Sequence, residues 1–186
     1  MPKKLTPYHL FALMLLLAGA IWIVLTAAIP GTTTQGKIPA PRAGFLAPDF
    51  TLTTADGNTI TLSELRGHPV IVNLWASWCG PCRAEMPALQ RVHETYKDTG
   101  LLLLAVNATP QDSEAAALTF ATELGLTFPI LFDAAGEVSR LYELRALPST
   151  YFIGPDGTIQ EVVIGGPMAE ALLRTRVEQL LALVDE

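Results

Sequence analysis

The chain has 186 residues and a formal net charge of −6, and half of its residues are apolar. All 18 acidic residues lie after residue 43, against eight basic ones there, which argues against nucleic acid or an anionic lipid surface as the partner. About 145 residues remain after an apolar N-terminal segment, enough for one ordinary domain.

The first predicted element is a membrane segment, Leu10–Ile29, which holds 20 residues without a charge. At 1.5 Å per residue it would span ~30 Å, the thickness of a bilayer core. Lys3 and Lys4 precede it, so the positive-inside rule predicts that residues 1–9 are cytoplasmic and that the following domain is extracytoplasmic. The apolar run is longer than that of a cleaved signal peptide, so we expect a transmembrane signal-anchor; Thr26-Ala27-Ala28 would nevertheless suit a cleavage site.

Residues 30–42 are rich in Gly, Thr and Pro, which predicts a flexible linker before a domain at 43–186. In that domain, Phe50–Thr53 and Thr59–Leu62 alternate apolar and polar residues on either side of an Asp-Gly turn. This pattern predicts a β-hairpin.

The next stretch carries the only two cysteines of the chain. Val70–Trp75 is an apolar run apart from Asn73, as expected of a central strand buried on both faces. A short turn leads to Cys79-Gly80-Pro81-Cys82 and then to a segment, 81–97, that favours a helix. A Cys-x-x-Cys motif between a strand and a helix is typical of a redox site.

Placement at a helix start would activate the first cysteine. The unpaired N–H groups and the macrodipole of a helix beginning near Cys79 favour a thiolate, so the pKa of Cys79 should fall below its free value. Pro81 suits the first turn, where its missing N–H is no loss. Cys82 lies one turn further on the same face and could close a disulfide, or resolve a mixed disulfide formed on Cys79.

Two other interpretations of the cysteines are weaker. A structural disulfide over so short a loop would constrain the unfolded chain little. A zinc site would need two more ligands, and His68 and His93 lack metal-binding spacing.

Glu85 is the acidic residue nearest to the cysteines in sequence. It follows Cys82 by three positions and therefore shares its helix face. A carboxylate there could accept the proton of the resolving thiol, or it could be a solvated residue of the first helical turns, where acids are favoured anyway.

The remaining pattern predicts alternating strands and helices and a late hairpin, hence an α/β domain with a mixed sheet. The predicted segments are a strand at Leu101–Asn107, a helix at Asp112–Leu124 capped by Asp112 or Ser113, a strand at Phe128–Phe132, a short helix at Gly136–Leu144, a hairpin of Tyr151–Ile153 with Thr158–Ile164, and a helix at Met168–Val184.

Three stretches resemble the thioredoxin superfamily, and together they resemble its TlpA/ResA-like branch. The motif W-C-G-P-C at Trp78–Cys82 is similar to the active site of that superfamily. Ala47–Gly67 resembles the N-terminal extension shared by the TlpA/ResA-like and peroxiredoxin-like branches, and L-P-S-T-Y-F-I from Leu147 onward resembles the cis-proline loop.

The resemblance implies a thioredoxin-like fold with helices flanking a mixed central sheet, a hairpin extension, and a βα insertion within 101–132. It implies a cis bond between Leu147 and Pro148, and a substrate groove formed by the residues Trp78, Gly80, Pro81, Leu147 and Pro148, with Trp75 as its floor. Asn73 stands where thioredoxin carries a buried acid, and C-x-x-C-x-x-E is how ResA-like reductases place an active-site Glu, which favours Glu85 as proton acceptor.

The implied function is an extracytoplasmic thiol–disulfide oxidoreductase on the cell membrane. It would reduce disulfides of exported proteins, such as apocytochrome c during cytochrome maturation, and a membrane electron-donor protein would recharge the Cys79–Cys82 pair. We expect no bound cofactor and no metal.

Three alternatives remain open. A thiol oxidase or disulfide isomerase would use the same motif with another redox poise. A peroxiredoxin-like peroxidase would need a reactive Cys flanked by Pro and Thr, unlike W-C-G-P-C. A membrane-tethered binding module would bind its partners without catalysing a reaction on them.

Overall fold

The computed structural model describes Tyr8, residues 14–19 and residues 38–184. The chain divides into two compact units, Met1–Gly36 and Lys37–Glu186, and the second is the domain considered below. Most of the predicted anchor at 10–29, and the linker up to residue 37, lie outside the described residues and stay predictions. Within the described part of the chain, no helix is both long and apolar enough to cross a membrane.

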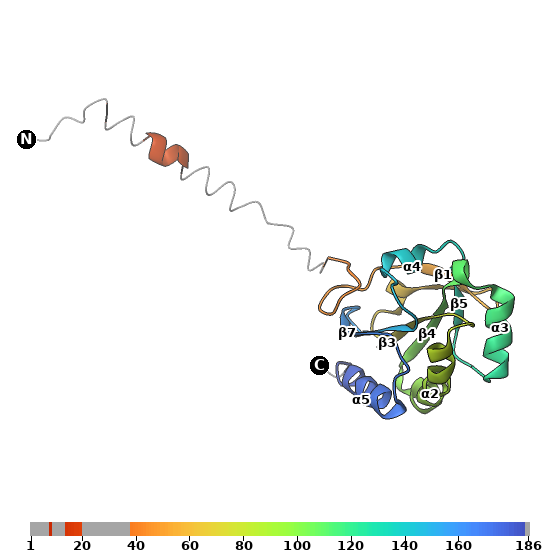
Figure 1. Cartoon of the computed structure of the whole chain (residues 1–186). Coiled ribbons are helices and arrows are strands. Elements are labelled where there is room, and N and C mark those ends of the chain that lie inside the picture. The colour runs from red at the N-terminus through yellow and green to blue at the C-terminus, as the bar shows by residue number, and fades with distance from the viewer. Residues whose placement is uncertain (1–7, 9–13, 20–37, 185–186) are drawn as a thin grey trace, which may run out of the picture. The chain divides into compact units, whose positions relative to one another are not determined.

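A mixed seven-stranded sheet forms the centre of the domain, as predicted (Figure 1). Its strands run in the order β2-β1-β5-β4-β3-β6-β7. Strands β3, β4 and β5 are parallel, and every other neighbouring pair is antiparallel. The strands are β1 (Thr51–Thr54), β2 (Thr59–Thr61), β3 (Val70–Trp75), β4 (Leu102–Asn107), β5 (Ile130–Phe132), β6 (Ser149–Ile153) and β7 (Ile159–Ile164).

Helices cover both faces of this sheet. Figure 1 shows α4 on the opposite side of the strands from α2 and α5. The α-helices are α2 (Gly80–Tyr96), α3 (Glu114–Glu123), α4 (Glu137–Leu141) and α5 (Glu170–Leu181), and the 3-10 turns are η1 (Leu62–Leu65), η2 (Lys97–Thr99) and η3 (Thr109–Gln111). In α5, Leu173, Val177 and Leu180 are buried, whereas Leu172 is 45% exposed.

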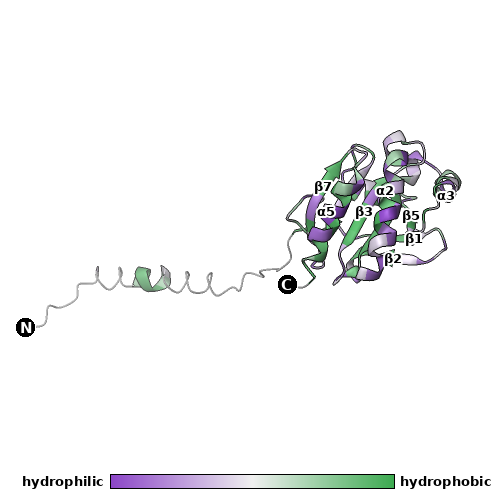
Figure 2. Ribbon diagram, turned by 90° about the horizontal axis from the view of Figure 1, so that it is seen from below, coloured by the Kyte–Doolittle hydropathy of each residue, from purple (hydrophilic) through white to green (hydrophobic). Residues whose placement is uncertain are grey.

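Strand β3 is buried along its whole length, because its alternate side chains enter two different cores. Ile71 and Trp75 pack with α2, α3 and α5, whereas Val70, Val72 and Leu74 pack with α4 and the N-terminal segment of the domain. Figure 2 shows apolar strands inside and hydrophilic stretches on the helices outside. Asn73 shares the face of Ile71 and Trp75, so its amide is directed into the core beneath α2.

The N-terminal extension lengthens the sheet rather than standing apart from it. The β1–β2 hairpin pairs with the edge of β5, where Thr53 lies opposite Phe132. Five residues of the predicted linker, 38–42, belong to the compact unit, and Pro39 bridges to Leu46. The domain therefore begins slightly before residue 43.

Candidate active site

Cys79 and Cys82 form a disulfide at the start of α2. Their Cα atoms lie 5.2 Å apart, and Cys79 is the N-cap of the helix. Its Sγ accepts a hydrogen bond from the backbone N–H of Cys82 at 3.1 Å, and Pro81 occupies the first turn. Both cysteines are buried, but Cys79 lines a hollow and Cys82 does not, so Cys79 is the one that a partner entering the hollow would meet. In the reduced state the same N–H would stabilise a thiolate on Cys79.

The loop before Cys79 is held by the segment that follows β4. The carboxylate of Asp112 accepts from the backbone N–H and the hydroxyl of Ser77, both at 2.6 Å, and from Asn107 Nδ2 at 2.8 Å. The indole N–H of Trp78 donates to the carbonyl of Gln111 at 2.6 Å. Partial burial raises the pKa of Asp112, but the bonds from Ser77, Asn107 and the Ser113 backbone outweigh it and hold the pKa below its usual value. Asp112 is therefore an ionised support of the cysteine loop.

Glu85 is buried, with 1% of its surface exposed, so the interpretation as a solvated helix residue is wrong. Its Oε1 accepts from Asn73 Nδ2 at 3.1 Å and its Oε2 from the backbone N–H of Met168 at 2.8 Å. Asn73 also donates to the Thr150 hydroxyl at 2.9 Å, because the two residues face each other across β3 and β6. Three elements thus converge on one carboxyl, one turn beyond Cys82.

Burial raises the pKa of Glu85, and the bonds from Met168, Thr150 and Asn73 offset only part of that effect. No charged side chain contributes to this rise in the pKa of Glu85. A carboxyl with a raised pKa, on the helix that starts at the cysteines, is a candidate for proton exchange at this site.

The predicted cis bond between Leu147 and Pro148 is confirmed. Pro148 is buried, and its carbonyl accepts from the backbone N–H of Gly165 at 2.8 Å. A second cis bond, Gly166–Pro167, lies in the loop between β7 and α5, and the sequence analysis did not predict it. The cis-proline loop is thus bonded to the loop that leads into α5.

A hollow of about 280 Å³ borders the disulfide and contains most of the predicted groove. Trp78, 60% exposed, stands at its rim, whereas Trp75 is fully buried and packs on Phe120 at a ring distance of 4.7 Å. Pro148, which was predicted to belong to the groove, is buried and is not among the lining residues. The lining residues are Trp78, Cys79, Gly80, Pro81, Gln111, Leu144, Arg145, Ala146 and Leu147.

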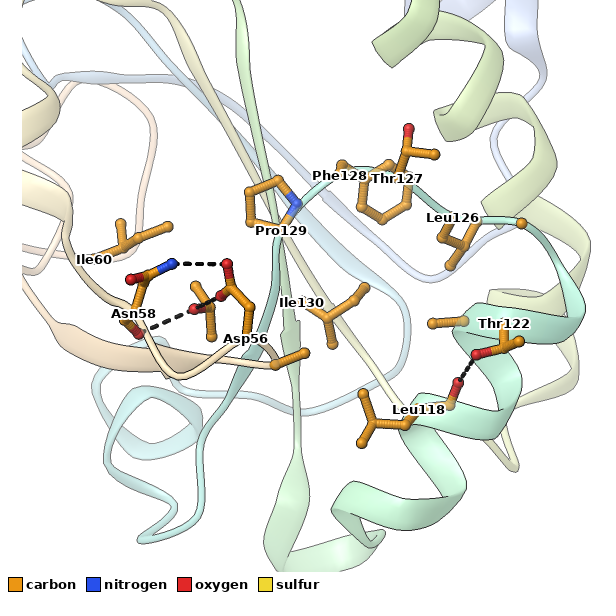
Figure 3. Close-up of a pocket in the computed structure, with 14 residues that line it drawn as sticks. Asp56, Asn58, Ile60, Leu118, Thr122, Leu126, Thr127, Phe128, Pro129 and Ile130 are labelled. Atoms are coloured by element: carbon orange, nitrogen blue, oxygen red, sulfur yellow. Dashed lines mark hydrogen bonds between the residues drawn. The ribbon is translucent and has the colours of Figure 1, made fainter.

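A larger hollow, of about 710 Å³, lies between the β1–β2 turn, α3 and residues 125–130 (Figure 3). None of the predicted site residues lines it. Its polar side chains are bonded within the domain: Asp56 accepts from Thr54 and from Asn58, and Thr122 donates to the carbonyl of Leu118. The hydroxyl of Thr127 accepts from Gln90 and donates to Glu94 on α2. The chemistry of the domain therefore belongs to the smaller hollow beside the cysteines.

Sequence reasoning missed Thr150, Met168 and Asp112 as parts of this site. Strand pairing brings Thr150 to Glu85, and a loop distant in sequence brings Met168 there. Neither contact produces a recognisable pattern in the local sequence. Asp112 was considered only as a helix cap. The cap of α3 is Ser113, whose hydroxyl accepts from Ala116 N–H, and this leaves Asp112 free to bind Ser77.

Comparison with known proteins agrees with this geometry. Residues 43–162 match the AhpC/TSA family. The thiol-disulfide oxidoreductase ResA of Geobacillus kaustophilus is 36% identical over 163 residues, which are 86% of this chain and 92% of that protein. The ResA of Oceanobacillus iheyensis is 43% identical over 128 residues, 67% of this chain and 66% of that protein.

A solved structure supports the same assignment. The thiol:disulfide interchange protein DsbE from Chlorobium tepidum aligns with a TM-score of 0.69 and 29% identity, covering 77% of this chain and 99% of that one. The chain therefore belongs to the AhpC/TSA family of the thioredoxin superfamily and, within it, to the ResA-like thiol–disulfide oxidoreductases.

Proposed function

We propose that this protein is a membrane-anchored, extracytoplasmic reductase of disulfides in exported proteins. The observation that carries the proposal is the combination of a helix-capping cysteine that lines a hollow, a buried partner cysteine and a buried carboxyl on the same helix. The charge-free segment Leu10–Ile29 would hold the domain at the membrane.

In the first step, the thiolate of Cys79 attacks one sulfur of the substrate disulfide. A mixed disulfide forms, and the other substrate sulfur leaves as a thiolate. The helix N-terminus and the Cys82 N–H stabilise the attacking thiolate. The exposed ring of Trp78 and the backbone of Leu147 would position the substrate chain along the groove.

In the second step, Cys82 resolves the mixed disulfide. Glu85 accepts the thiol proton, and the Cys82 sulfur attacks Cys79 Sγ; the second substrate thiolate leaves and takes up a proton. The substrate gains two electrons, and the protein ends with the Cys79–Cys82 disulfide present in the structure. A membrane electron-donor protein would return the pair to its dithiol form.

The two cysteines are tested separately. We expect Cys79→Ser to remove exchange with a substrate disulfide by at least about 10³-fold, because the attacking thiolate is lost. Cys82→Ala should still attack but should hold the partner as a mixed disulfide. Mass spectrometry of the trapped species then names the substrate, for which apocytochrome c is our proposal; full function of Cys79→Ser would instead favour a binding module.

The direction of electron flow follows from the reduction potential of the pair. A value near that of thioredoxin, about −270 mV, supports a reductase, whereas one near about −120 mV would make the protein an oxidant. A peroxiredoxin-like peroxidase is the other enzymatic alternative, so peroxide turnover is measured alongside. A useful rate that depends on Cys79 would contradict the proposal.

A further inference from the structure

Gly166, in the loop between β7 and α5, lies against both Glu85 and Pro148. A β-carbon placed on it would be 2.7 Å from Glu85 Oε2 and 2.8 Å from Pro148 Cγ, closer than real β-carbons approach their neighbours. Gly166 does not have the positive φ of its neighbour Gly165, so this position requires the absence of a side chain rather than an unusual backbone.

The residues on either side of Gly166 are bonded to the same two partners. The N–H of Gly165 donates to the Pro148 carbonyl at 2.8 Å, and the N–H of Met168 donates to Glu85 Oε2 at 2.8 Å. Gly166 and Pro167 are themselves exposed, although Glu85 is not. Residues 165–168 therefore form a cover that lies over the carboxyl on the solvent side; we call it the Gly166 cover.

We propose that Gly166 is a positioning residue for Glu85: by lacking a side chain, it lets the Gly166 cover lie directly on the carboxyl, exclude water and fix Oε2 beside Pro148 of the cis-proline loop. The proposal rests on the proton-accepting role of Glu85 in the proposed function.

The Gly166 cover acts on Glu85 in two opposite ways. It buries the carboxyl, which raises its pKa, and it donates one N–H, which lowers it; burial is the larger of the two. The other groups that bond to the carboxyl are the neutral side chains of Asn73 on β3 and Thr150 on β6. Cys82, three residues earlier on the same helix, is in the disulfide and titrates only when reduced. Lifting the Gly166 cover should therefore lower the pKa of Glu85 toward its usual value.

The test compares Gly166→Ala with Gly165→Ala in the oxidised full-length chain in mild detergent. Both variants add one methyl group to the same loop. At Gly166 the methyl meets Glu85 and Pro148, whereas at Gly165 it meets nothing within 4 Å and only strains a φ of 82°. The titration of Glu85 is read by carboxyl ¹³C NMR, with its resonance assigned from Glu85→Gln.

We expect the Gly166→Ala midpoint to fall by about half a pH unit or more, and the Gly165→Ala midpoint to stay at the wild-type value. In the reduced protein, the resolving step of Gly166→Ala should slow about tenfold because the acceptor is no longer held in place. An unchanged midpoint in Gly166→Ala, or an equal shift in both variants, overturns the proposal.

A second measurement covers the case in which Gly166→Ala does not fold. In the wild-type protein, the amide proton of Met168 should shift with the same midpoint as the Glu85 carboxyl; independent titration overturns the proposal. Both readouts are taken on oxidised protein without substrate. If the wild-type chain lacks disulfide-exchange activity, the proposed function is wrong. The two NMR titrations would still show whether the Gly166 cover positions Glu85.

Discussion

Glu85 and Asp112 are two acids that follow the cysteine pair in the sequence and support it at different points. Asp112 holds the loop before Cys79 through three donors from Ser77 and Asn107. Glu85 lies one turn after Cys82 and receives its bonds from a neutral amide, a hydroxyl and one backbone N–H. The number of donors is similar, but the pKa of Asp112 is lowered and that of Glu85 is raised.

The difference comes from burial. Asp112 is partly exposed, so its donors outweigh the cost of desolvation and the group stays ionised. Glu85 is enclosed between β3, β6 and the loop before α5, so desolvation outweighs its donors. A partly exposed carboxylate with several donors, such as Asp112, stays an anion. A buried carboxyl with similar donors, such as Glu85, is able to gain and lose a proton.

Replacing Glu85 by Gln should have the largest effect on the reaction. We expect the resolving step to slow by about 100-fold at neutral pH, because Gln accepts no proton from Cys82. The fold should survive, since the unpaired Oδ1 of Asn73 can accept from the new amide after a flip. Quenched-flow detection of the mixed disulfide measures the step.

Glu94→Gln is the matched control for this prediction. Glu94 lies on the same helix, but it is exposed and bonds to Lys97 at 2.6 Å. Its variant should resolve the mixed disulfide at the wild-type rate. If Glu85→Gln also does so, Glu85 is a structural residue and the contrast with Asp112 disappears.

Replacing Asp112 by Ala should mainly affect stability. The change leaves the N–H and hydroxyl of Ser77 and the amide of Asn107 without this acceptor. We expect the free energy of unfolding to fall by about 2 kcal/mol, measured by urea titration. The exposed Asp98 provides the control, because Asp98→Ala should change it by less than about 0.5 kcal/mol. Equal effects of the two variants would show that Asp112 does not hold the loop.

The two acids should contribute to stability with opposite dependence on pH. The lowered pKa of Asp112 stabilises the fold above its unfolded-state value, and this contribution is lost as pH falls through the folded value. The raised pKa of Glu85 makes the fold lose stability as pH rises from the unfolded value through the folded one. Between about pH 2 and pH 7, and relative to wild type, Asp112→Asn should therefore lose stability as pH rises toward the unfolded-state value of aspartate, 3.8, whereas Glu85→Gln should gain stability as pH rises above that of glutamate, 4.5. Urea titrations of the oxidised proteins across this range check both signs, and parallel curves would contradict them.

The strands and helices were largely predictable, because their signals are local. The apolar run Val70–Trp75 gives the bounds of β3, and the strand–Cys-x-x-Cys–helix order places Cys79 at the start of α2. The pairing of the N-terminal hairpin with β5 was not predicted, since no periodicity within the hairpin tells which strand edge receives it. The cis Leu147–Pro148 bond was predicted only through family resemblance.

The site was predictable to the extent that it lies on one helix. Spacing placed Glu85 on the face of Cys82, but it left open whether the carboxyl was solvated or buried. The burial of Glu85 depends on Thr150, which strand pairing places opposite Asn73. It also depends on the loop carrying Gly166 and Met168, which is more than 80 residues away in sequence. Such long-range contacts set the pKa and cannot be deduced from the motif alone.

Thr150→Val should have the smallest effect on stability, and it tests separately how donors and burial set the pKa of Glu85. It removes the hydroxyl that bonds Glu85 and accepts from Asn73, and it keeps the volume of a buried β-branched side chain. We expect a loss of about 1 kcal/mol in unfolding free energy. The pKa of Glu85 should rise further, because one of the donors that opposed burial is gone while burial itself is unchanged. The limb of the pH–rate profile that reports Glu85 should therefore move to higher pH, opposite to the movement expected for Gly166→Ala; a limb that stays in place would mean that burial alone sets the protonation of Glu85.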